Sequence, residues 1–301
     1  MIIVTGAAGF IGTHLVKNLK GLKKEVIAVD TRLDDLKEGM SPKALLRNLN
    51  QDVFRYRGGV EAVIHQGANS DTTCYDTKKI MRTNFNYSVD LLNACLDREI
   101  PFIYASSAAV YGNGPFNEDS AKEPKNIYGK TKFLFDKYVE CFLQGGPPSQ
   151  IVGLRYFNVY GPHETHKNKM ASVTHQFFQQ IKESGKIQIF KNSENYKRDF
   201  LSVEDAVKVN LHFLANPSIS GIFNCGTGTA ESFYDIVRIL KTRYDFDIEE
   251  VEMPLGLEEK YQKYTCSDNE HLQNTGGYKN NFLSLEDGVL SYLDFLEKNS
   301  T

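Results

Sequence analysis

Short apolar runs alternate with stretches of helical periodicity through the first half of the chain. The apolar run Met1–Val4 breaks into a glycine turn, and apolar residues recur at helical spacing beyond Gly12. The same alternation predicts further strands at 25–30, 60–65, 102–106 and 151–157, and helices at 80–96 and 128–142. Such alternation is typical of a parallel, doubly wound sheet with right-handed crossovers. The pattern therefore predicts an α/β fold.

The glycine turn has the spacing Gly-x-x-Gly-x-x-Gly, formed by Gly6, Gly9 and Gly12. The first glycine permits a tight turn, the second lets the backbone approach a pyrophosphate, and the third lets helix and sheet pack closely. The N-terminus of the following helix offers N–H groups and a partial positive charge to phosphate. Strand, glycine turn and helix together predict a dinucleotide-binding domain of the Rossmann type.

The second half follows the alternation less regularly. Helices are expected at 170–184, 202–215, 232–244 and 283–296, with short strands at 187–190 and 221–226. We expect a Rossmann domain at 1–157, to which about 200–228 and 276–297 return. A smaller, discontinuous α/β domain for substrate is expected at about 158–199 and 229–275. Residues 31–59 fit least well, and only Asp52–Phe54 resembles a strand there.

An acidic residue, Asp30, closes the second expected strand. An acid at this place normally bonds the adenosine ribose hydroxyls, which favours NAD. Arg32 and Lys37 follow closely, and they could neutralise the 2′-phosphate of NADP or lie on a solvated loop. The residues alone leave both cofactors open.

Composition excludes several classes of partner. The net charge is -3, so no basic excess points to nucleic acid or to an anionic membrane. No apolar stretch is long enough to span a bilayer, and the N-terminus lacks the basic leader of a signal peptide. Five scattered cysteines are typical of a reducing cytoplasm. No metal site is expected, because His163, Glu164 and His166 lack the metal-binding spacing H-E-x-x-H.

Tyr128 and Lys132 are four residues apart on an expected helix and would share one face. A phenol is a poor base at neutral pH, and a close ammonium lowers its pKa. Ser107, at the end of the preceding strand, could bond a substrate oxygen, or it could simply cap the strand. Tyr75 and Lys79 have the same spacing without a glycine loop nearby, and we assign that pair to a surface helix.

These motifs resemble the extended short-chain dehydrogenase/reductase family, most of whose members are nucleotide-sugar epimerases or dehydratases. The resemblance rests on the glycine turn, Ser107, the Tyr128–Lys132 pair, and the segments 155–162 and 198–200. Finer strings are similar to the branch of this family that inverts C6 of the ADP-linked heptose used for the lipopolysaccharide inner core. They lie at 104–112, 127–136, 166–173, 193–200 and 226–233.

The resemblance implies a 6-epimerase that holds NADP, with NAD possible, and that passes through a transient 6-keto sugar. It implies catalytic roles for Tyr128 and Lys167 as the two acid/base groups, with Ser107 and Lys132 beside them. The implied cofactor-binding residues are Gly6, Gly9, Phe10, Ile11, Gly12, Asp30, Thr31, Lys37, Gln66, Gly67, Ala68, Asn69, Ser70, Thr83, Lys132, Val159 and Lys167. The implied substrate-binding residues are Ser107, Asn158, Lys169, Gln176, Phe190, Lys191, Asn192, Ser193, Arg198 and Tyr261.

Three positions depart from the family pattern. Lys169 replaces a small serine, Gln176 replaces a histidine although His175 is adjacent, and Thr83 replaces an asparagine. An epimerase or dehydratase of another nucleotide sugar is therefore a second hypothesis. The alanines that follow Ser107 count against a dehydratase, which would need an acid there. A non-catalytic dinucleotide-binding protein is the third hypothesis. The resemblance also implies a homo-oligomer, which is a pentamer in relatives.

Overall fold

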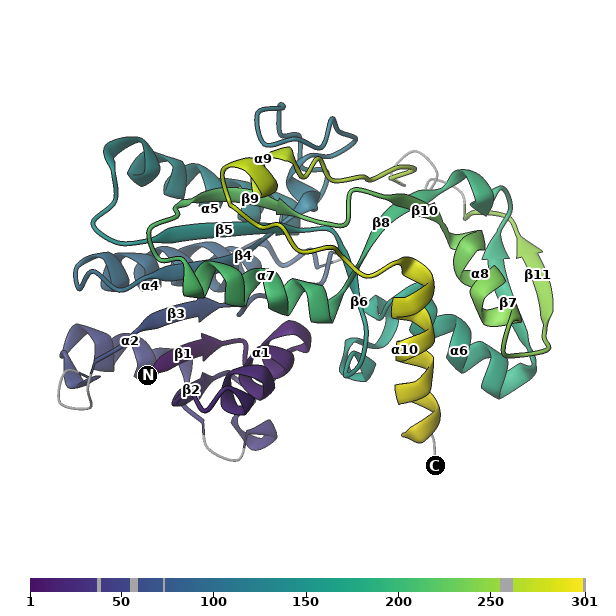
Figure 1. Cartoon of the computed structure of the whole chain (residues 1–301), viewed down its shortest axis with the longest axis horizontal. Helices are drawn as coiled ribbons and strands as arrows, with labels where there is room; N and C mark the ends of the chain where they lie inside the picture. Colours follow the sequence, from purple (N-terminus) through teal and green to yellow (C-terminus); the bar gives the residue numbers. More distant parts are fainter. Residues whose placement is uncertain (37–38, 55–58, 73, 255–261, 300–301) are drawn as a thin grey trace.

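A six-stranded parallel sheet forms the centre of the computed structural model, which describes residues 1–36, 39–54, 59–72, 74–254 and 262–299 (Figure 1). The strand order is β2-β1-β3-β4-β5-β9, and every neighbouring pair is parallel. These strands are β1 (Ile2–Thr5), β2 (Val26–Val29), β3 (Ala62–His65), β4 (Phe102–Ser107), β5 (Ile151–Tyr156) and β9 (Gly221–Cys225). The predicted α/β fold with a doubly wound parallel sheet is confirmed.

Helices cover both faces of this sheet. One face carries α1 and α7, which contact each other, and the other carries α2, α4 and α5 (Figure 1). The helices on the two faces are α1 (Phe10–Gly21), α7 (Val203–Ala215), α2 (Pro42–Asn50), α4 (Tyr87–Leu96) and α5 (Ile127–Gly145). A short α3 (Thr77–Met81) runs into α4 through a π-helical turn, η3 (Arg82–Asn86). Among the described residues no helix is long and apolar enough to cross a membrane.

The direction of strand succession reverses beside β1. The chain passes from β1 outward to β2, and then returns to the other side of β1 to add β3, β4 and β5. In open α/β sheets, the crevice outside the carboxyl ends of the strands at such a switch point is the usual ligand site. The turn after β1, which contains the three predicted glycines, lies at this point.

A second, smaller unit follows β5. Its strands are β6 (Asn158–Tyr160), β7 (Lys186–Phe190), β8 (Lys197–Ser202), β10 (Ala230–Ser232) and β11 (Asp247–Val251). They form a sheet ordered β10-β8-β6 and a separate β11-β7 pair. Three helices, α6 (Val173–Ser184), α8 (Phe233–Lys241) and α10 (Leu285–Lys298), surround a buried core that includes Phe178, Ile187 and Leu293.

The segment 276–297, expected at about these bounds to return to the Rossmann domain, packs against two cores. Tyr278 is buried with Phe213 and Phe223 against the main sheet, near α9 (Glu270–Asn274). In contrast, α10 contacts α8 and β8 and joins the core of the second unit. The apolar stripe of α10, which includes Val289, explains this packing, because that stripe is buried only there. The domain boundaries stay predictions.

The described residues of 31–54 form no strand, so the interpretation of Asp52–Phe54 as strand-like is wrong. Asp52 has a left-handed backbone with φ 53°, and Phe54 is buried in the main core. Helix α2 fills the region by packing against α4. The surface-helix assignment of Tyr75 and Lys79 is also wrong for Tyr75, because α3 begins two residues after it at Thr77.

Candidate active site

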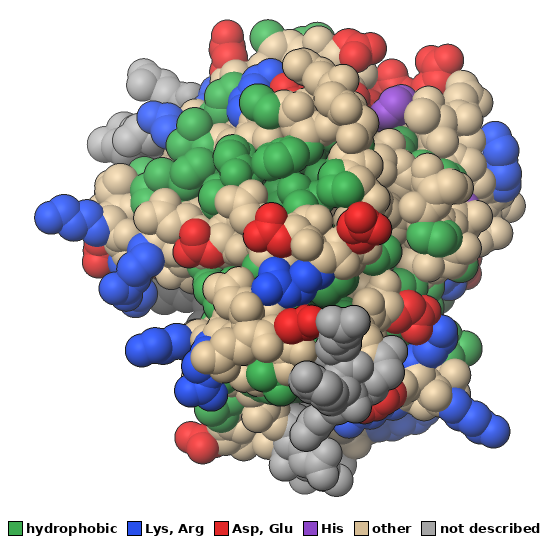
Figure 2. Space-filling view, turned by 90° about the vertical axis from the view of Figure 1, so that its left-hand side faces the viewer, with side chains coloured by type: hydrophobic (Ala, Val, Ile, Leu, Met, Phe, Trp, Pro, Cys, Tyr) green, Lys and Arg blue, Asp and Glu red, His purple; other side chains and the backbone are tan. Residues whose placement is uncertain are grey.

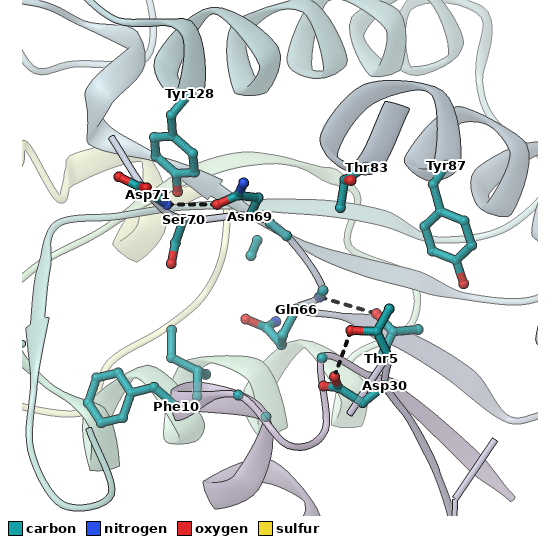
Figure 3. A pocket seen from close by; sticks show the side chains of 18 of the residues that line it. Thr5, Phe10, Asp30, Gln66, Asn69, Ser70, Asp71, Thr83, Tyr87 and Tyr128 are labelled. Carbon is teal, nitrogen blue, oxygen red and sulfur yellow. Dashed lines mark hydrogen bonds between the residues drawn. The ribbon is translucent and has the colours of Figure 1, made fainter. Parts of the chain in front are cut away.

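A cavity of about 1350 Å³ opens at the carboxyl ends of the central strands. Its walls come from the glycine turn, the loop 66–72 after β3, the end of β4, the start of α5 and the short helix η5 (Thr165–Met170). Figure 3 shows Phe10, Gln66 and Tyr128 reaching into it from three of these segments. Residues from both halves of the chain therefore form one site.

The glycine turn has no room for side chains. Gly6 has φ +66°, and a Cβ there would lie 2.7 Å from the backbone of Gln66. A Cβ on Gly12 would lie 2.0 Å from the carbonyl oxygen of Gly6, far inside any allowed contact. Gly9 is the N-cap of α1 and supplies no side-chain cap, and no acid occupies the first turn of the helix. The helix N-terminus is therefore suited to a pyrophosphate.

Asp30 joins the glycine turn to the end of β2. Its carboxylate accepts hydrogen bonds from the backbone N–H of Ala8 and of Arg32, each at 3.0 Å. Beside it the N-terminus of α2 contributes four cavity residues that sequence reasoning missed, namely Ser41, Pro42, Lys43 and Leu46. Ser41 followed by Pro42 is a typical helix start, so this helix could have been predicted.

The loop after β3 is held by the π-helical turn. Asn84 accepts from the N–H of Asn69 at 2.7 Å and donates to the carbonyl of the same residue at 2.9 Å. Its amide also contacts the hydroxyl of Thr131 on α5 at 3.3 Å. Thr83, the neighbour of Asn84, lines the cavity. Although Thr83 replaces the asparagine of the family pattern, the adjacent Asn84 connects the loop to α5.

One wall of the cavity also offers an unpaired acceptor. The side-chain oxygen of Gln66 is buried and has no hydrogen-bond partner in the described part of the chain. A bound ligand with hydroxyl groups could satisfy it. With the glycine turn and the uncapped start of α1, this acceptor fits a dinucleotide in the cavity.

Tyr128, Lys132 and Ser107 lie together, as their spacing predicts. Tyr128 is in the first turn of α5, whose N-cap is Asn126. The ammonium of Lys132 lies 5.9 Å from the centre of the Tyr128 ring and donates to the carbonyl of Ala105 at 2.7 Å. Ser107 accepts from the N–H of Ala109 at 3.2 Å, so it caps the turn after β4 in addition to facing the cavity.

The expected lowering of the Tyr128 pKa by Lys132 is not found in the chain alone. Burial raises the pKa of Tyr128, and the hydrogen bond with Ser107 opposes that shift. Burial also lowers the pKa of Lys132 to about 8, against the charge of Asp136. The pKa of Tyr128 is not lowered as expected, because the Lys132 ammonium donates to the carbonyl of Ala105 instead of to the phenol.

Lys167 reaches the cavity from η5, in the second half of the chain. Its ammonium forms a 3.0 Å ion pair with Glu164 and lies 4.5 Å from the centre of the Phe10 ring. Glu164 has no exposed surface, whereas 20% of the Lys167 side chain is accessible. Sequence reasoning missed Glu164 as a functional candidate, because nothing in the sequence indicates that this carboxylate is buried.

All four predicted catalytic residues line the one cavity. The predicted cofactor residues that line it are Gly6, Gly9, Phe10, Ile11, Gly12, Asp30, Thr31, Gln66, Gly67, Ala68, Asn69, Ser70, Thr83, Lys132, Val159 and Lys167. Lys37 lies outside the described residues. The structure therefore brings together these predicted cofactor residues from seven separate segments.

The predicted substrate residues are more dispersed. Apart from Ser107, the described members lie outside the lining of the cavity. Arg198 is buried, with its guanidinium 5.4 Å from the centre of the Phe233 ring. The neighbouring Asp199 is also buried, and its carboxylate accepts from the backbone N–H of Thr227 at 2.7 Å.

Two further substrate candidates are engaged within the chain. Asn158 is exposed and donates to the carbonyl of Asp199 and to the hydroxyl of Thr265. The amide of Gln176 donates to the carbonyl of Ala171 at 2.7 Å, while the adjacent His175 is buried against Tyr292.

The other substrate candidates cluster around the end of β7. Phe190 is half-buried, Lys191 forms an ion pair with Glu252, and Asn192 has a left-handed backbone with φ 62°. The hydroxyl of Ser193 donates to the carbonyl of Phe190. Tyr261 and the side chain of Lys169 lie outside the described residues.

Comparison with known proteins agrees with this geometry. Residues 2–226 match the NAD dependent epimerase/dehydratase family. A curated ADP-L-glycero-D-manno-heptose-6-epimerase from Brachyspira hyodysenteriae is 46% identical over 99% of this chain and 98% of the relative.

Solved structures agree over the whole length. The ADP-L-glycero-D-manno-heptose-6-epimerase of Helicobacter pylori superposes with a TM-score of 0.83 at 30% identity, covering 98% of this chain and 96% of the other. The UDP-glucose 4-epimerase of Thermotoga maritima gives a TM-score of 0.83 at 26% identity, covering 100% and 99%. The family takes a nicotinamide dinucleotide, as the glycine turn requires. The chain belongs to the NAD dependent epimerase/dehydratase family.

Proposed function

We propose that the chain is an ADP-L-glycero-D-manno-heptose 6-epimerase, an isomerase that interconverts the D-glycero and L-glycero forms of the sugar. The observation that carries this proposal is the placement of two acid/base groups, Tyr128 and Lys167, in the wall of one dinucleotide-type cavity. They come from different elements, α5 and η5, so they can reach a sugar carbon from different sides. The similarity to two heptose 6-epimerases supports this choice of sugar.

Inversion at C6 needs one group that removes the hydroxyl proton and another that protonates the ketone oxygen after the sugar has turned. We assign the first role to Tyr128 and the second to Lys167, which forms an ion pair with Glu164. In the reverse direction the two roles exchange. Ser107 lies beside Tyr128 and would hold the same sugar oxygen.

A nicotinamide dinucleotide, when bound, would supply reversible hydride transfer at C6, so that the sugar is inverted without net oxidation. The chain would hold it with the glycine turn at the pyrophosphate, Asp30 and Thr31 at the adenosine ribose, and Lys132 at the nicotinamide ribose. Each of these groups lines the cavity.

We propose NADP as the preferred cofactor. Arg32 and Lys43 line the cavity near Asp30. They supply positive charge where an adenosine 2′-phosphate would lie, next to the N-terminus of α2. NAD would leave these cations without an anionic partner from the ligand.

Epimerisation of another nucleotide sugar is the second candidate. Gln176 replaces the histidine of the family pattern and binds Ala171 within the chain. The UDP-glucose 4-epimerase of Thermotoga maritima shares the fold over nearly all of both chains. A different sugar would need the same two acid/base groups, so the second candidate changes the substrate and not the chemistry.

A substrate panel distinguishes the two candidates. Purified protein is incubated separately with ADP-D-glycero-D-manno-heptose and with UDP-glucose, without added cofactor, and the products are identified by NMR. We expect conversion of the ADP-heptose alone, and mass spectrometry of the denatured protein should detect released NADP. Conversion of UDP-glucose alone would support the second candidate and contradict the first.

We also propose that the chain forms a homo-oligomer in the cytoplasm. Hydrophobic side chains gather in a patch on the face seen in Figure 2, the end of the molecule at the left of Figure 1. The strands begin at this end, so the patch lies opposite the active-site cavity. Association through it would leave the cavity open to substrate.

A further inference from the structure

The structure assigns a positioning role to Glu164, an inference that rests on the proposed function of Lys167 as the second acid/base group. We infer that the buried carboxylate holds the ammonium of Lys167 at the cavity and sets the pH at which the lysine loses its proton. Nothing in the sequence motifs or in the family resemblance assigned a role to this residue.

Glu164 is held from several sides. One carboxylate oxygen accepts from the backbone N–H of Ser172 at 2.7 Å and from the ammonium of Lys167 at 3.0 Å. The other oxygen accepts from the hydroxyl of Ser172. The N–H of Lys167 also donates to the backbone carbonyl of Glu164 at 2.9 Å, which closes the turn between them. The carboxylate therefore has little freedom to move.

The position of Lys167 follows from two contacts. Glu164 attracts the ammonium from within the protein, and the ring of Phe10 lies 4.5 Å away on the side of the glycine turn. An aromatic face attracts an ammonium at this distance. The amine thus lies between the second unit and the segment predicted to bind the pyrophosphate, where a sugar next to the nicotinamide would meet it.

The carboxylate has a consequence for proton transfer. A fully buried carboxylate is costly unless it is paired, so Glu164 favours the protonated form of its only lysine partner among the described contacts. When Lys167 gives its proton to the ketone oxygen, that pairing is lost, and recovery of a proton is favoured. Glu164 would therefore restore Lys167 for the next turnover without touching the sugar itself.

Other titratable groups surround the pair. His166 precedes Lys167 in η5, and its pKa is lowered first by burial and then by Arg32 and Lys167. His175 on α6 has its pKa lowered by burial, with Glu164 acting in the opposite direction.

Tyr292 on α10 completes this set. Burial, the Glu164 charge and a hydrogen bond with Glu164 raise the pKa of Tyr292, so the phenol stays neutral near pH 7. The pKa values of both histidines are lowered, so their charge changes below the usual histidine range, and a control variant separates their effect from the titration of Lys167.

The test measures the titration of Lys167 directly. Trace acetylation with acetic anhydride at a series of pH values, followed by peptide mass spectrometry, reports the deprotonated fraction of each lysine. Glu164→Gln keeps the size of the side chain and removes its charge. We expect the midpoint for Lys167 to fall in Glu164→Gln, since the variant removes the opposite charge that lies against the ammonium.

The chain provides a matched control. Asp205 and Lys208 form a second ion pair with the same i,i+3 spacing, a fully buried carboxylate and a 2.7 Å separation, on α7 outside the cavity lining. Asp205→Asn should shift the midpoint of Lys208 and leave Lys167 unchanged, whereas Glu164→Gln should do the reverse. An unchanged Lys167 midpoint in folded Glu164→Gln would overturn the inference.

Glu164→Asp protects the test against a folding defect. The shorter aspartate keeps the charge but moves it away from Lys167. The midpoint of Lys167 in this variant should therefore fall between the midpoints in the wild type and in Glu164→Gln. If the proposed function holds, the pH–rate profile of epimerisation moves in the same direction as the labelling. A labelling shift in a protein that converts no ADP-heptose would overturn the proposed function and leave the pairing intact.

Discussion

Tyr128 shows how far residue spacing predicts chemistry. The four-residue interval to Lys132 correctly places both side chains in one cavity. The spacing does not predict their charge states, because these depend on burial and on the bond between Lys132 and the carbonyl of Ala105. In the chain alone the phenol is a weaker acid than usual. The positive nicotinamide ring of the oxidised cofactor is the charge that would favour the phenolate.

Removal of the Tyr128 hydroxyl tests this residue's role. We expect Tyr128→Phe to fold and to retain bound cofactor, while turnover falls by about 10²–10⁴-fold, the usual contribution of a general acid/base. Turnover is measured by NMR with ADP-heptose, and cofactor content by absorbance after denaturation.

Tyr138→Phe is the matched control for this variant. Tyr138 lies on the same helix and donates to the side chain of Asn93 at 2.9 Å, away from the cavity. Its loss should leave turnover close to that of the wild type. Equal turnover by Tyr128→Phe and Tyr138→Phe would remove Tyr128 from the mechanism.

At the residue level, the sequence predicted backbone and motif positions better than buried partners. Gly6, Gly12 and Ser107 belong to local motifs, and all three line the cavity. Glu164 and Asn84 act through partners that are distant from them or hidden by folding, so no local pattern identifies them. The burial of Arg198 against Phe233 likewise depends on a tertiary contact that the local sequence does not indicate.

At the element level, His65 connects β1, β3 and α4. Its Nδ1 lies 2.6 Å from the hydroxyl of Thr5, and its Nε2 lies 2.8 Å from that of Ser88. The N–H of Gly67 donates to the Thr5 hydroxyl, and the Ser88 hydroxyl donates to the carbonyl of Asn84. These bonds fit a neutral imidazole whose Nδ1 accepts and whose Nε2 donates, directly beneath the cofactor loop.

Stability should therefore fall on acidification. Burial lowers the pKa of His65 to about 3, whereas an unfolded histidine titrates near 6.5. Between these values the unfolded chain binds more protons, so the free energy of unfolding falls with decreasing pH, by roughly 1.4 kcal/mol per unit from this group. Urea denaturation of the wild type and of His65→Gln from pH 7 to pH 4.5 measures the difference. Parallel curves for the two proteins would contradict the assignment.

Helix α1 provides a second element-level test, because it has a glycine at each end. Gly12→Ala places a methyl group against the carbonyl oxygen of Gly6, so we expect a loss of about 1–3 kcal/mol of stability and of cofactor binding. Gly21→Ala at the last position meets nothing within 4 Å, and it should be neutral or stabilising by up to about 1 kcal/mol. Thermal unfolding and cofactor titration compare the two variants. Equal effects would show that close packing at Gly12 is not required.

The strands and helices of the Rossmann unit could be predicted because each carries its own periodicity. In the region 31–54, the start of α2 at Ser41 and Pro42 could have been predicted, but its packing on α4 could not. The π-helical turn η3 was also not predictable, because its apolar spacing differs little from that of an ordinary helix.

At the scale of the whole molecule, the active site depends on two cores. The core of the main sheet positions the glycine turn and α5, while Tyr292 of the second core hydrogen-bonds with Glu164, the partner of Lys167. The last helix packs on the second unit although its linker, at Tyr278, packs on the first. A chain that crosses between the units in this way fixes Lys167 relative to Tyr128, and two-sided proton transfer at C6 requires that arrangement.

The most direct test of the account is the origin of the hydrogen at C6. The protein is incubated with ADP-D-glycero-D-manno-heptose in deuterated buffer without added cofactor, and NMR follows C6. The account predicts a mixture of D-glycero and L-glycero products with no deuterium on C6, because the same hydrogen leaves and returns. Deuterium at C6 of the product would show that a proton, and not a hydride, leaves this carbon. That result would contradict the mechanism proposed for Tyr128 and Lys167.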